Sequence, residues 1–336
     1  MKDIARRAGV SESAVSFALN GRPGVSETTR ARVHRVAEQL GWRPSTAARA
    51  LSGEGAATVG FVLARPADTL GVDSFFLQLV SGIQEVLAER HLGLLFQVAR
   101  DVADECGVYR RWWAEHRVDG VLVADPRATD PRPDLLDELG LPAVVIGGAP
   151  DERHPGLSTV WADDAGAMAA VVDELTALGH RRIVHIAGLP DLAHTQRRIR
   201  TLRAEARRRG LSEVESVTTD YSDVAAAAVT RRVLHGPTPP TALVYDNDVM
   251  AVAGVAAAAE LGFGVPADLS VVAWEDSALC RIVKPWLSAL SRDSVKFGVT
   301  AARELLALLD GGPARAVRVP VPRLIERDST GPARSG

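Results

Sequence analysis

Short apolar runs rich in β-formers alternate with longer helical stretches from residue 58 to residue 274. Such alternation is typical of a parallel sheet whose faces are covered by helices. The expected strands are 58–64, 93–99, 120–124 and 143–147, followed by 183–187, 216–220, 242–246 and 270–274. The expected helices are 75–90, 105–116, 163–178, 195–209, 225–234 and 249–261. Because the pattern occurs twice, it predicts two similar α/β lobes.

The N-terminal region has a different pattern, that of three short helices. A small apolar stripe at residues 4, 5 and 8 is followed by a tight turn, in which Ser11 is the N-cap of a second helix. A third helix begins at the N-cap Ser26 and ends at Gly41. This order is typical of a helix-turn-helix, whose second helix presents its early turns to base edges. The predicted contacts with DNA on this head are Ser11, Glu12, Ser13, Ser16, Phe17 and Asn20.

Basic residues are concentrated at the N-terminus. Residues 1–53 hold nine Lys and Arg against four Asp and Glu, a net charge of +5, so that the remainder carries −8 of the total of −3. This asymmetry suits a basic DNA reader joined to a body without affinity for phosphate. The alternative is a merely solvated basic surface. The coincidence of the charge with the helix-turn-helix pattern favours the DNA reader.

A short segment, R-P-S-T-A-A-R-A-L at residues 43–51, follows the third helix, which Pro44 interrupts. Its residues could form two helical turns, too few to be stable alone, so we expect it to fold only when docked. With this segment the chain closely resembles the LacI/GalR family of bacterial transcription regulators. The resemblance implies paired hinge helices in the minor groove, with Leu51 as a wedge in the central base step and Arg49 beside it. The alternative is an ordinary linker with one exposed leucine.

The resemblance continues through the body of the chain. The run L-G-H-R-R-I-V-H-I-A-G at residues 178–188 is very similar to the family's helix-to-strand junction at the start of the second lobe. The implied fold class is α/β, with an N-terminal helix-turn-helix head and a two-lobed, periplasmic-binding-protein-like (Rossmann-like) effector domain. A small molecule is then expected between the lobes, outside the carboxyl ends of their strands.

The resemblance also implies domain boundaries. They are 1–43 for the helix-turn-helix head, 44–57 for the hinge helix and linker, and 58–330 for the effector-binding and dimerisation domain. Within that domain, lobe 1 is expected at about 58–155 and 286–320, and lobe 2 at about 156–285 and 321–330.

Several side chains are implied as contacts of the effector. Arg198 falls at the family's effector-binding arginine, although its helix is so rich in arginine that a solvated surface residue is the alternative. Asp248 matches an aspartate that accepts hydrogen bonds from the effector, although Asn-Asp after a strand can also cap a helix. The full set of implied effector contacts is Phe75, Asp163, Arg198, Tyr221, Asp248 and Trp274. Aromatic faces beside polar anchors suit a sugar or a base.

Some residues depart from the family's pattern. They are Phe17 for the commonest arginine, Ala14 for threonine, Asp164 for asparagine, and Trp274-Glu275 for Phe-Asp. Phe17 cannot read guanine through paired hydrogen bonds but can press on a thymine methyl group. The DNA half-site is therefore expected to differ from that of arginine-bearing relatives.

Other classes of protein find little support in the sequence. There is no nucleophile elbow, Walker loop, HExxH or dinucleotide fingerprint, so we expect no enzyme, and no cofactor or metal. Cys106 and Cys280 lack disulfide or zinc spacing and are expected to be free, buried thiols. Without an apolar run of spanning length or a signal-peptide core, the chain is expected in the cytoplasm and away from membranes.

Together these features predict a dimeric, sequence-specific repressor that a small sugar-like effector releases from a palindromic operator in double-stranded DNA. The helix at 75–90 is expected to contribute to the homodimer. A co-repressor-dependent regulator of the purine type is the main alternative. A solute-binding protein and a sugar-modifying hydrolase are further alternatives, but neither class of protein accounts for the basic helix-turn-helix head at the N-terminus.

Overall fold

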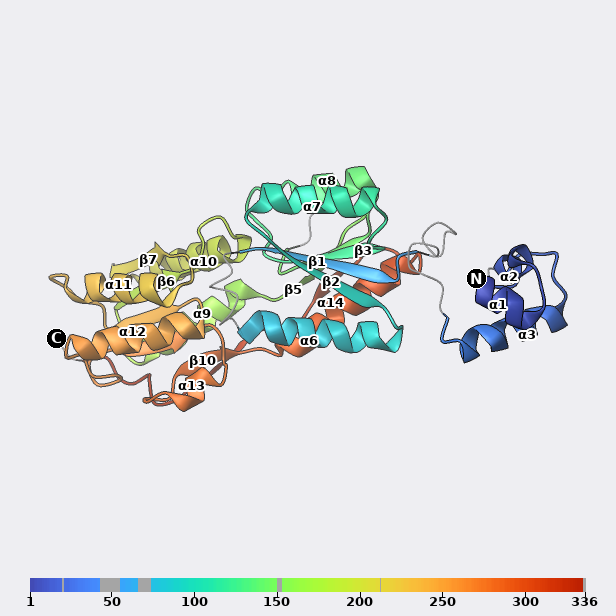
Figure 1. Ribbon diagram of the computed structural model, residues 1–336. Coiled ribbons are helices and arrows are strands. Elements are labelled where there is room, and N and C mark those ends of the chain that lie inside the picture. The colour runs from blue at the N-terminus through green and yellow to red at the C-terminus, as the bar shows by residue number, and fades with distance from the viewer. Residues whose placement is uncertain (20, 43–54, 66–73, 150–152, 212, 335–336) are drawn as a thin grey trace.

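The computed structural model describes residues 1–19, 21–42, 55–65, 74–149, 153–211 and 213–334. Figure 1 shows the N-terminal head and a body made of two α/β lobes. The predicted hinge residues Arg49 and Leu51, and the predicted DNA contact Asn20, lie outside the described residues.

Three helices form the head, as the sequence predicts: α1 (Lys2–Ala8), α2 (Glu12–Leu19) and α3 (Glu27–Gln39). Gly9 makes the turn after α1 in the left-handed region, with a φ of 64°. Ser11 Oγ accepts a hydrogen bond from the backbone N–H of Ala14 at 3.2 Å, which confirms it as the N-cap of α2. The helices close over a small apolar core that includes the fully buried Val15 and Val33.

One cation of the head has a structural role. The Arg30 guanidinium on α3 donates hydrogen bonds to the carbonyl oxygens of Ala18 and Arg22, both at 3.0 Å. It thereby satisfies carbonyl groups at the end of α2 and in the following loop. Not every basic residue of the head is therefore available to DNA phosphates.

The first lobe contains a six-stranded sheet in the order β11-β5-β4-β3-β1-β2, and all of its pairs are parallel. Its strands are β1 (Thr58–Ala64), β2 (Gly93–Ala99), β3 (Gly120–Val123), β4 (Ala143–Ile146), β5 (Ser158–Trp161) and β11 (Ala316–Arg318). Its helices are α6 (Ser74–Glu89), α7 (Val102–Ala114), α8 (Arg132–Leu139) and α14 (Ser294–Leu309), with α7 and α8 on one face and α6 and α14 on the other (Figure 1). Strands buried on both faces read as continuous apolar runs, which is why β1 was visible in the sequence.

The second lobe repeats this arrangement with a sheet in the order β12-β10-β9-β8-β6-β7. Its strands are β6 (Arg182–Ala187), β7 (Glu213–Thr218), β8 (Ala242–Tyr245), β9 (Ser270–Ala273), β10 (Ser288–Ser291) and β12 (Arg323–Ile325), of which β12 runs antiparallel to β10. Its helices are α9 (Asp164–Ala177), α10 (Ala193–Arg209), α11 (Asp223–Leu234), α12 (Asp248–Glu260) and α13 (Leu279–Ile282). The expected fold of two similar lobes is confirmed.

The strand order in each lobe reverses at one place, between β1 and β3 in the first and between β6 and β8 in the second. The loops at the carboxyl ends of neighbouring strands diverge at such a point and leave a crevice for a ligand. The fold therefore positions a site where the two crevices face each other.

The expected lobe boundaries need correction at two strands. β5 (158–161) belongs to the first sheet, although lobe 2 was expected from about residue 156. β10 (288–291) belongs to the second sheet, although lobe 1 was expected to resume at about residue 286. The local pattern shows that a segment is a strand but not which distant strand it pairs with, and pairing decides the lobe.

The helix α14 was not predicted, although it forms much of the first lobe's core. Phe297, Ala301 and Leu305 on its inner face are buried. α14 packs closely on α6 because glycines lie at the contact: a Cβ on Gly82 would be 1.9 Å from the carbonyl oxygen of Val295.

The two thiols also agree with expectation, since Cys106 and Cys280 are free and buried.

We predict that Gly82→Ala lowers the free energy of unfolding by about 1–3 kcal/mol, because the added methyl group meets backbone that cannot rotate away. The measurement is the urea midpoint followed by circular dichroism. Gly107→Ala in α7 is the matched control, since its Cβ would meet no heavy atom within 4 Å. The control should be neutral or more stable by up to about 1 kcal/mol. Equal effects at the two glycines would contradict the tight α6–α14 contact.

Candidate ligand site between the lobes

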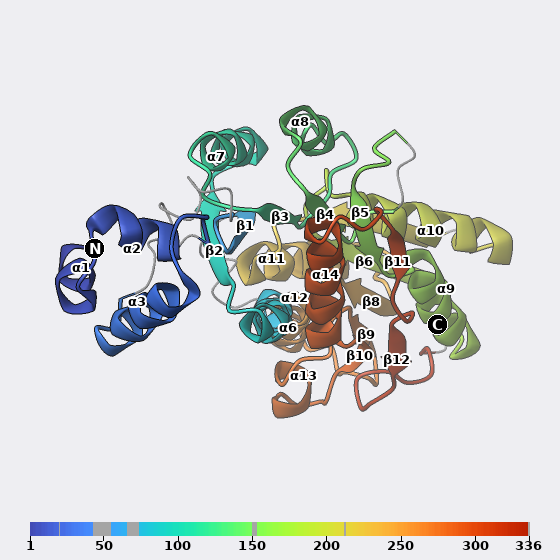
Figure 2. The ribbon, with the colours of Figure 1, turned by 90° about the vertical axis from the view of Figure 1, so that its right-hand side faces the viewer.

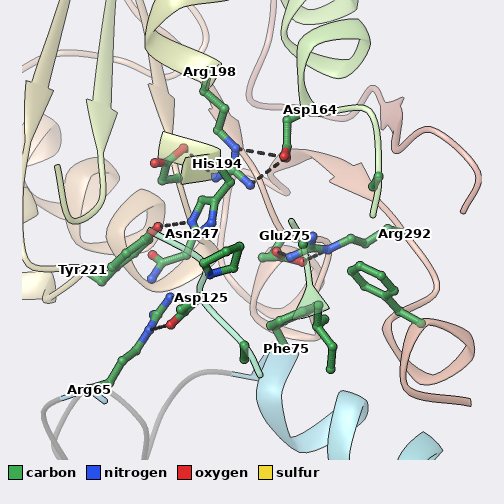
Figure 3. A pocket seen from close by; sticks show the side chains of 17 residues that line it. Arg65, Phe75, Asp125, Asp164, His194, Arg198, Tyr221, Asn247, Glu275 and Arg292 are labelled. Atoms are coloured by element: carbon green, nitrogen blue, oxygen red, sulfur yellow. Dashed lines mark hydrogen bonds and ion pairs between the residues drawn. The ribbon is translucent and has the colours of Figure 1, made fainter. Parts of the chain in front are cut away.

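A cavity lies between the lobes and is lined by residues that follow the carboxyl ends of strands (Figure 3). Its volume is about 60 Å³, room for a few water molecules and much less than a sugar needs. The lobes are thus closed over the site, and a sugar-sized ligand requires them to separate. The lining residues are Arg65, Phe75, Ala124, Asp125, Pro126, Ile146, Gly147, Ala162, Asp164, His194, Arg198, Tyr221, Asp246, Asn247, Glu275, Arg292 and Phe297.

Arg198 projects from α10 into the centre of this cavity and is only 3% exposed. Its Nη1 donates to Asp246 Oδ1 at 2.8 Å, and its Nη2 donates to Asp164 Oδ1 at 3.1 Å. Arg198 therefore lines the cavity and is not a solvated surface residue, and its contact with an effector stays a prediction. Because both carboxylates are held by the same guanidinium, one side chain organises much of the second lobe's side of the cleft.

Asp246 connects Arg198 to the sheet beneath it. Besides Arg198, its carboxylate accepts a hydrogen bond from the backbone N–H of Gly188 at 2.8 Å and contacts His185 Nε2 at 2.9 Å. Burial alone would raise the pKa of Asp246, but the Arg198 charge and these hydrogen bonds hold it well below its usual range. Asp246 is therefore ionised at neutral pH and fixed in one orientation.

Trp274 supports Arg198 from behind and does not line the cavity. The indole is fully buried, and the Arg198 guanidinium carbon lies 3.9 Å from the centre of its ring. An arginine stacked on an aromatic face is stabilised electrostatically and loses its freedom to rotate. The predicted effector contact at Trp274 is thus one layer away from the lining, and its observed contact is with Arg198.

Tyr221 lines the cavity, as predicted, and is held in an unusual backbone conformation with a φ of 72°. Its hydroxyl lies 2.8 Å from His194 Nε2, and the Arg65 guanidinium from the first lobe lies 4.6 Å from its ring centre. Gly188 makes room for the ring, since a Cβ there would be 1.8 Å from a ring carbon. Tyr221 therefore links the lobes through an aromatic face and offers a polar tip beside His194.

The first lobe contributes Arg65, Asp125 and Phe75. Arg65 Nη2 donates to Asp125 Oδ1 at 3.0 Å, and its Nε donates to the other carboxylate oxygen, so the pair is bidentate. Phe75, a predicted contact, lines the cavity beneath Arg292, whose guanidinium carbon is 4.1 Å from the ring centre. Arg292 in turn forms an ion pair with Glu275. These contacts place charged groups on both sides of the cleft.

Two predicted effector contacts lie at the starts of helices and do not line the cavity. Asp163 is the N-cap of α9, accepting from the Gly166 N–H at 2.9 Å, and it pairs with Arg318 at 2.6 Å. Asp248 lies in the first turn of α12, where it is 2% exposed and Oδ2 has no hydrogen-bond partner among the described residues. The capping alternative considered for the Asn-Asp pair applies to Asn247, whose Oδ1 accepts from the Met250 N–H at 2.7 Å.

Sequence reasoning missed several lining residues. Asp164 and Asn247 are each adjacent to a predicted residue, and they reach the cavity because the turn of the chain at a helix start directs neighbouring side chains apart. Asp246 directly follows β8, and Asp125 lies two residues after the end of β3; this position after a strand was the available signal. Arg292 follows β10, a strand that the pattern did not reveal.

The head presents its predicted DNA contacts to solvent. Ser11, Glu12, Ser13 and Phe17 are exposed, and Ser16 is half-buried. Phe17 is 38% exposed. The exposed face of α2 is therefore open to a partner in the geometry that a recognition helix requires.

Known proteins match both parts of the chain. A family model described as bacterial regulatory proteins, lacI family, matches residues 1–45, and a model described as a periplasmic binding protein-like domain matches residues 172–330. The HTH-type transcriptional regulator AglR of Rhizobium meliloti is 31% identical over 347 aligned residues, which cover 99% of this chain and 94% of AglR. The curated relatives are transcriptional regulators and not enzymes.

Two solved structures resemble the whole chain. The transcriptional regulator CelR in complex with cellobiose matches with a TM-score of 0.74 and 26% identity, covering 97% of this chain and 98% of that one. The lac repressor dimer bound to operator and the anti-inducer ONPF matches with a TM-score of 0.82 and 24% identity, covering 98% of each chain.

Within the described residues, no helix is long and apolar enough to cross a membrane.

We predict that His194 makes stability fall at mildly acidic pH. Enclosure in the cleft and the neighbouring Arg198 charge lower the pKa of His194 to about 4. The unfolded chain takes up this proton below about pH 6.5, and the folded chain does so only near pH 4. The free energy of unfolding should therefore fall between pH 6.5 and 4, by at most about 1.4 kcal/mol per pH unit from this group.

Urea unfolding at half-unit steps between pH 4 and 7 measures this slope. His194→Asn should flatten it in that window. His235→Asn is the control, because His235 is exposed and distant from the cleft, and it should retain the original slope. An unchanged slope in His194→Asn would rule out His194 as the source.

Proposed function

The chain belongs to the LacI family of bacterial regulatory proteins and is a transcriptional regulator, and we propose that it is a dimeric repressor that a small, uncharged sugar releases from a palindromic operator. The observation that carries this proposal is the combination of an exposed, basic helix-turn-helix head with a polar, charge-balanced cleft between two lobes. Because such a regulator acts on bacterial DNA, the proposal assigns it to the cytoplasm.

The head supplies the affinity for DNA. The net charge of +5 over residues 1–53 favours the phosphate backbone, and the outer face of α2 supplies candidates for base contacts. Phe17 provides an apolar surface for a thymine methyl group. In a dimer, two heads would meet successive major grooves and two Leu51 side chains the central minor groove.

Exposed apolar side chains support the dimer. Leu77 on α6 is 68% exposed, Phe96 on β2 is 47% exposed and Ile282 on α13 is 72% exposed. Figure 2 shows the three elements that carry them, β2 and α6 of the first lobe and α13 of the second, in the left-hand part of the body. A second copy of the chain would cover such a surface, and a twofold dimer would require a palindromic site.

The chemistry of the cleft favours an uncharged polyol. Arg65, Arg198 and Arg292 line the cavity together with four carboxylates, those of Asp125, Asp164, Asp246 and Glu275. A fourth cation, Arg197, lies outside the lining and donates to Asp164 at 2.9 Å, so the charges of the network are balanced. A charged ligand would leave part of this buried network uncompensated, whereas sugar hydroxyl groups both donate and accept. Tyr221 and Phe75 provide the aromatic faces on which sugar rings pack. The related CelR, crystallised with cellobiose, is consistent with this class.

Release would follow from the closed arrangement of the lobes. Three contacts connect the first lobe with the second. Arg65 lies against the ring of Tyr221, and Arg292 lies against the ring of Phe75. Arg197 Nη2 donates a hydrogen bond to the Gly147 carbonyl at 2.7 Å. A sugar inside the cleft must replace some of these contacts and change the angle between the lobes. The sugar shifts the equilibrium between operator-bound and free protein. The size of the shift is set by the difference between the binding free energies of the sugar for the closed and the opened lobes.

We predict that selection from random duplex DNA with the purified full-length protein enriches a palindrome with a flexible central step. Leu51→Ala should weaken binding to that palindrome by at least about tenfold, because the wedge that stabilises the kinked centre is lost. Binding to unrelated DNA at low salt should persist, since the basic head is unchanged. The measurements are sequencing of the enriched DNA and titration by fluorescence anisotropy.

The outcomes separate the alternatives. Enrichment only after a small molecule is added would favour the purine-type, co-repressor-dependent mechanism. Enrichment of a single, unrepeated half-site would contradict the dimer. No enrichment under any condition would contradict specific DNA recognition by the Phe17-bearing head.

We predict that Asn247→Ser weakens sugar-induced release about three- to tenfold. Asn247 Nδ2 faces the cavity side of the N-cap, and losing one hydrogen bond to the ligand costs about 0.5–1.5 kcal/mol. Serine is an equally good N-cap, so α12 should remain intact. The measurement is the concentration of cellobiose, or of the sugar found by screening, that releases half of the operator.

The matched control is Asp101→Ser, which replaces the N-cap of α7, a residue that does not line the cavity. It should leave the half-release concentration unchanged. If both variants respond to sugar as the original protein does, Asn247 does not contact the effector.

A further inference from the structure

A second cavity, of about 370 Å³, lies beside the cleft between α8, the loops after β3 and β4, strand β5 and the start of α10. α8, β4, β5 and α10 lie together in the upper right of the body in Figure 2. This volume falls in the range of small-molecule sites, whereas the closed cleft does not. The cavity is therefore large enough for a metabolite in the conformation described.

Its walls combine an apolar floor with a basic rim. The floor is made by Val123, Leu136, Val145 and Leu157. The rim is basic, and Asp130 is its only lining carboxylate among the described residues, already bonded to Arg132 at 2.7 Å. The cationic lining residues are Arg127, Arg153, Arg197 and Arg200, with His154 beside them. Arg200 on α10 is exposed and forms no ion pair with any described residue.

Two buried polar atoms in the wall lack partners within the described residues. Thr159 is 7% exposed, and its Oγ1 has no hydrogen bond. The Arg127 Nε, a donor, is likewise buried and unpaired. Buried polar groups are nearly always hydrogen-bonded, so such atoms in the wall of a cavity point to an occupant that supplies the missing oxygens.

We propose that this second cavity binds a small organic anion carrying a phosphate or carboxylate group. The anion's oxygens would accept from Arg127 Nε and Thr159 Oγ1, the rim arginines would compensate its charge, and its carbon body would lie on the apolar floor. The chemistry thus differs from that of the charge-balanced cleft.

The cavity is placed to influence the relation between the lobes. Its lining comes from the first lobe up to Thr159 and from the second lobe at Ala193, Gln196, Arg197 and Arg200. The lobes already meet at its edge, where Ala128 N–H donates to the Asp191 carbonyl at 2.9 Å and Ala193 N–H donates to the Pro126 carbonyl at 2.8 Å. An occupant that touches both walls stabilises this closed arrangement.

The two cavities are separate. Arg197 stands between them, donating to Asp164 Oδ2 at 2.9 Å on the cleft side and to the Gly147 carbonyl. Pro126 lines both. An anion in the second cavity therefore does not occupy the sugar's space, although by stabilising the closed lobes it opposes the separation that a sugar requires. Its binding does not depend on the proposed operator.

The test is isothermal titration of the full-length protein with three matched probes: glucose, gluconate and glucose 6-phosphate. We expect at least one anionic probe to bind and glucose to bind at least tenfold more weakly at this site. Thr159→Val should weaken anion binding about three- to tenfold without lowering Tm, since the hydroxyl has no partner to lose. Arg200→Gln should weaken it about two- to fivefold, as expected for an exposed charge.

Arg203→Gln is the matched control, because Arg203 is an exposed arginine of the same helix that lines neither cavity. It should bind the anion as the original protein does, and so should Asn247→Ser, which alters only the cleft. The proposal is overturned if neither anion binds, if Arg203→Gln weakens binding as much as Arg200→Gln, or if Asn247→Ser weakens binding as much as Thr159→Val and so assigns the anion to the cleft.

Discussion

The rest of the interlobe site depends on one buried interaction, the Arg198 guanidinium held between Asp164 and Asp246 and stacked on Trp274. Breaking a buried ion pair by removing one partner costs about 3–5 kcal/mol, because the remaining charge is left uncompensated. Two carboxylates of the second lobe's side take their orientation from this cluster: Asp246 continues to Gly188 and His185, and Asp164 continues to Arg197. A ligand therefore meets a preorganised surface that needs little rearrangement to bind.

The first lobe contributes a bidentate ion pair of its own, between Arg65 and Asp125. The first and second lobes contact each other there through aromatic rings. Cation–π contacts of Arg65 with Tyr221 and of Arg292 with Phe75 hold the lobes together without using up hydrogen bonds. Such contacts are individually weak, so the closed arrangement can open at moderate cost. A two-state regulator requires rigid lobes with individually weak contacts between them, and this protein has both.

Charge is divided between the parts of the molecule according to their tasks. The head concentrates positive charge on a domain with a small core, which suits contact with phosphates. The body is negative overall and keeps its buried arginines in ion pairs, among them Arg198 in the cleft and Arg132 with Glu105. The basic rim of the second cavity lies where both lobes contribute to one wall.

The sequence by itself determined the elements that have a strong local signal: the three helices of the head with the Ser11 cap, the apolar strands such as β1, and Arg198 as a cleft residue through family resemblance. It was weaker at edges, where β7 (213–218) alternates polar and apolar residues and was expected at 216–220. Only the tertiary structure decided the lobe membership of β5 and β10, the contact of α14 with α6, and which of two adjacent residues, Asp163 or Asp164 and Asn247 or Asp248, reaches the cavity. The reason is physical: periodicity and capping act between neighbours in the chain, whereas strand pairing, close helix contacts and the direction of a side chain at a helix start are fixed by atoms brought together from distant segments.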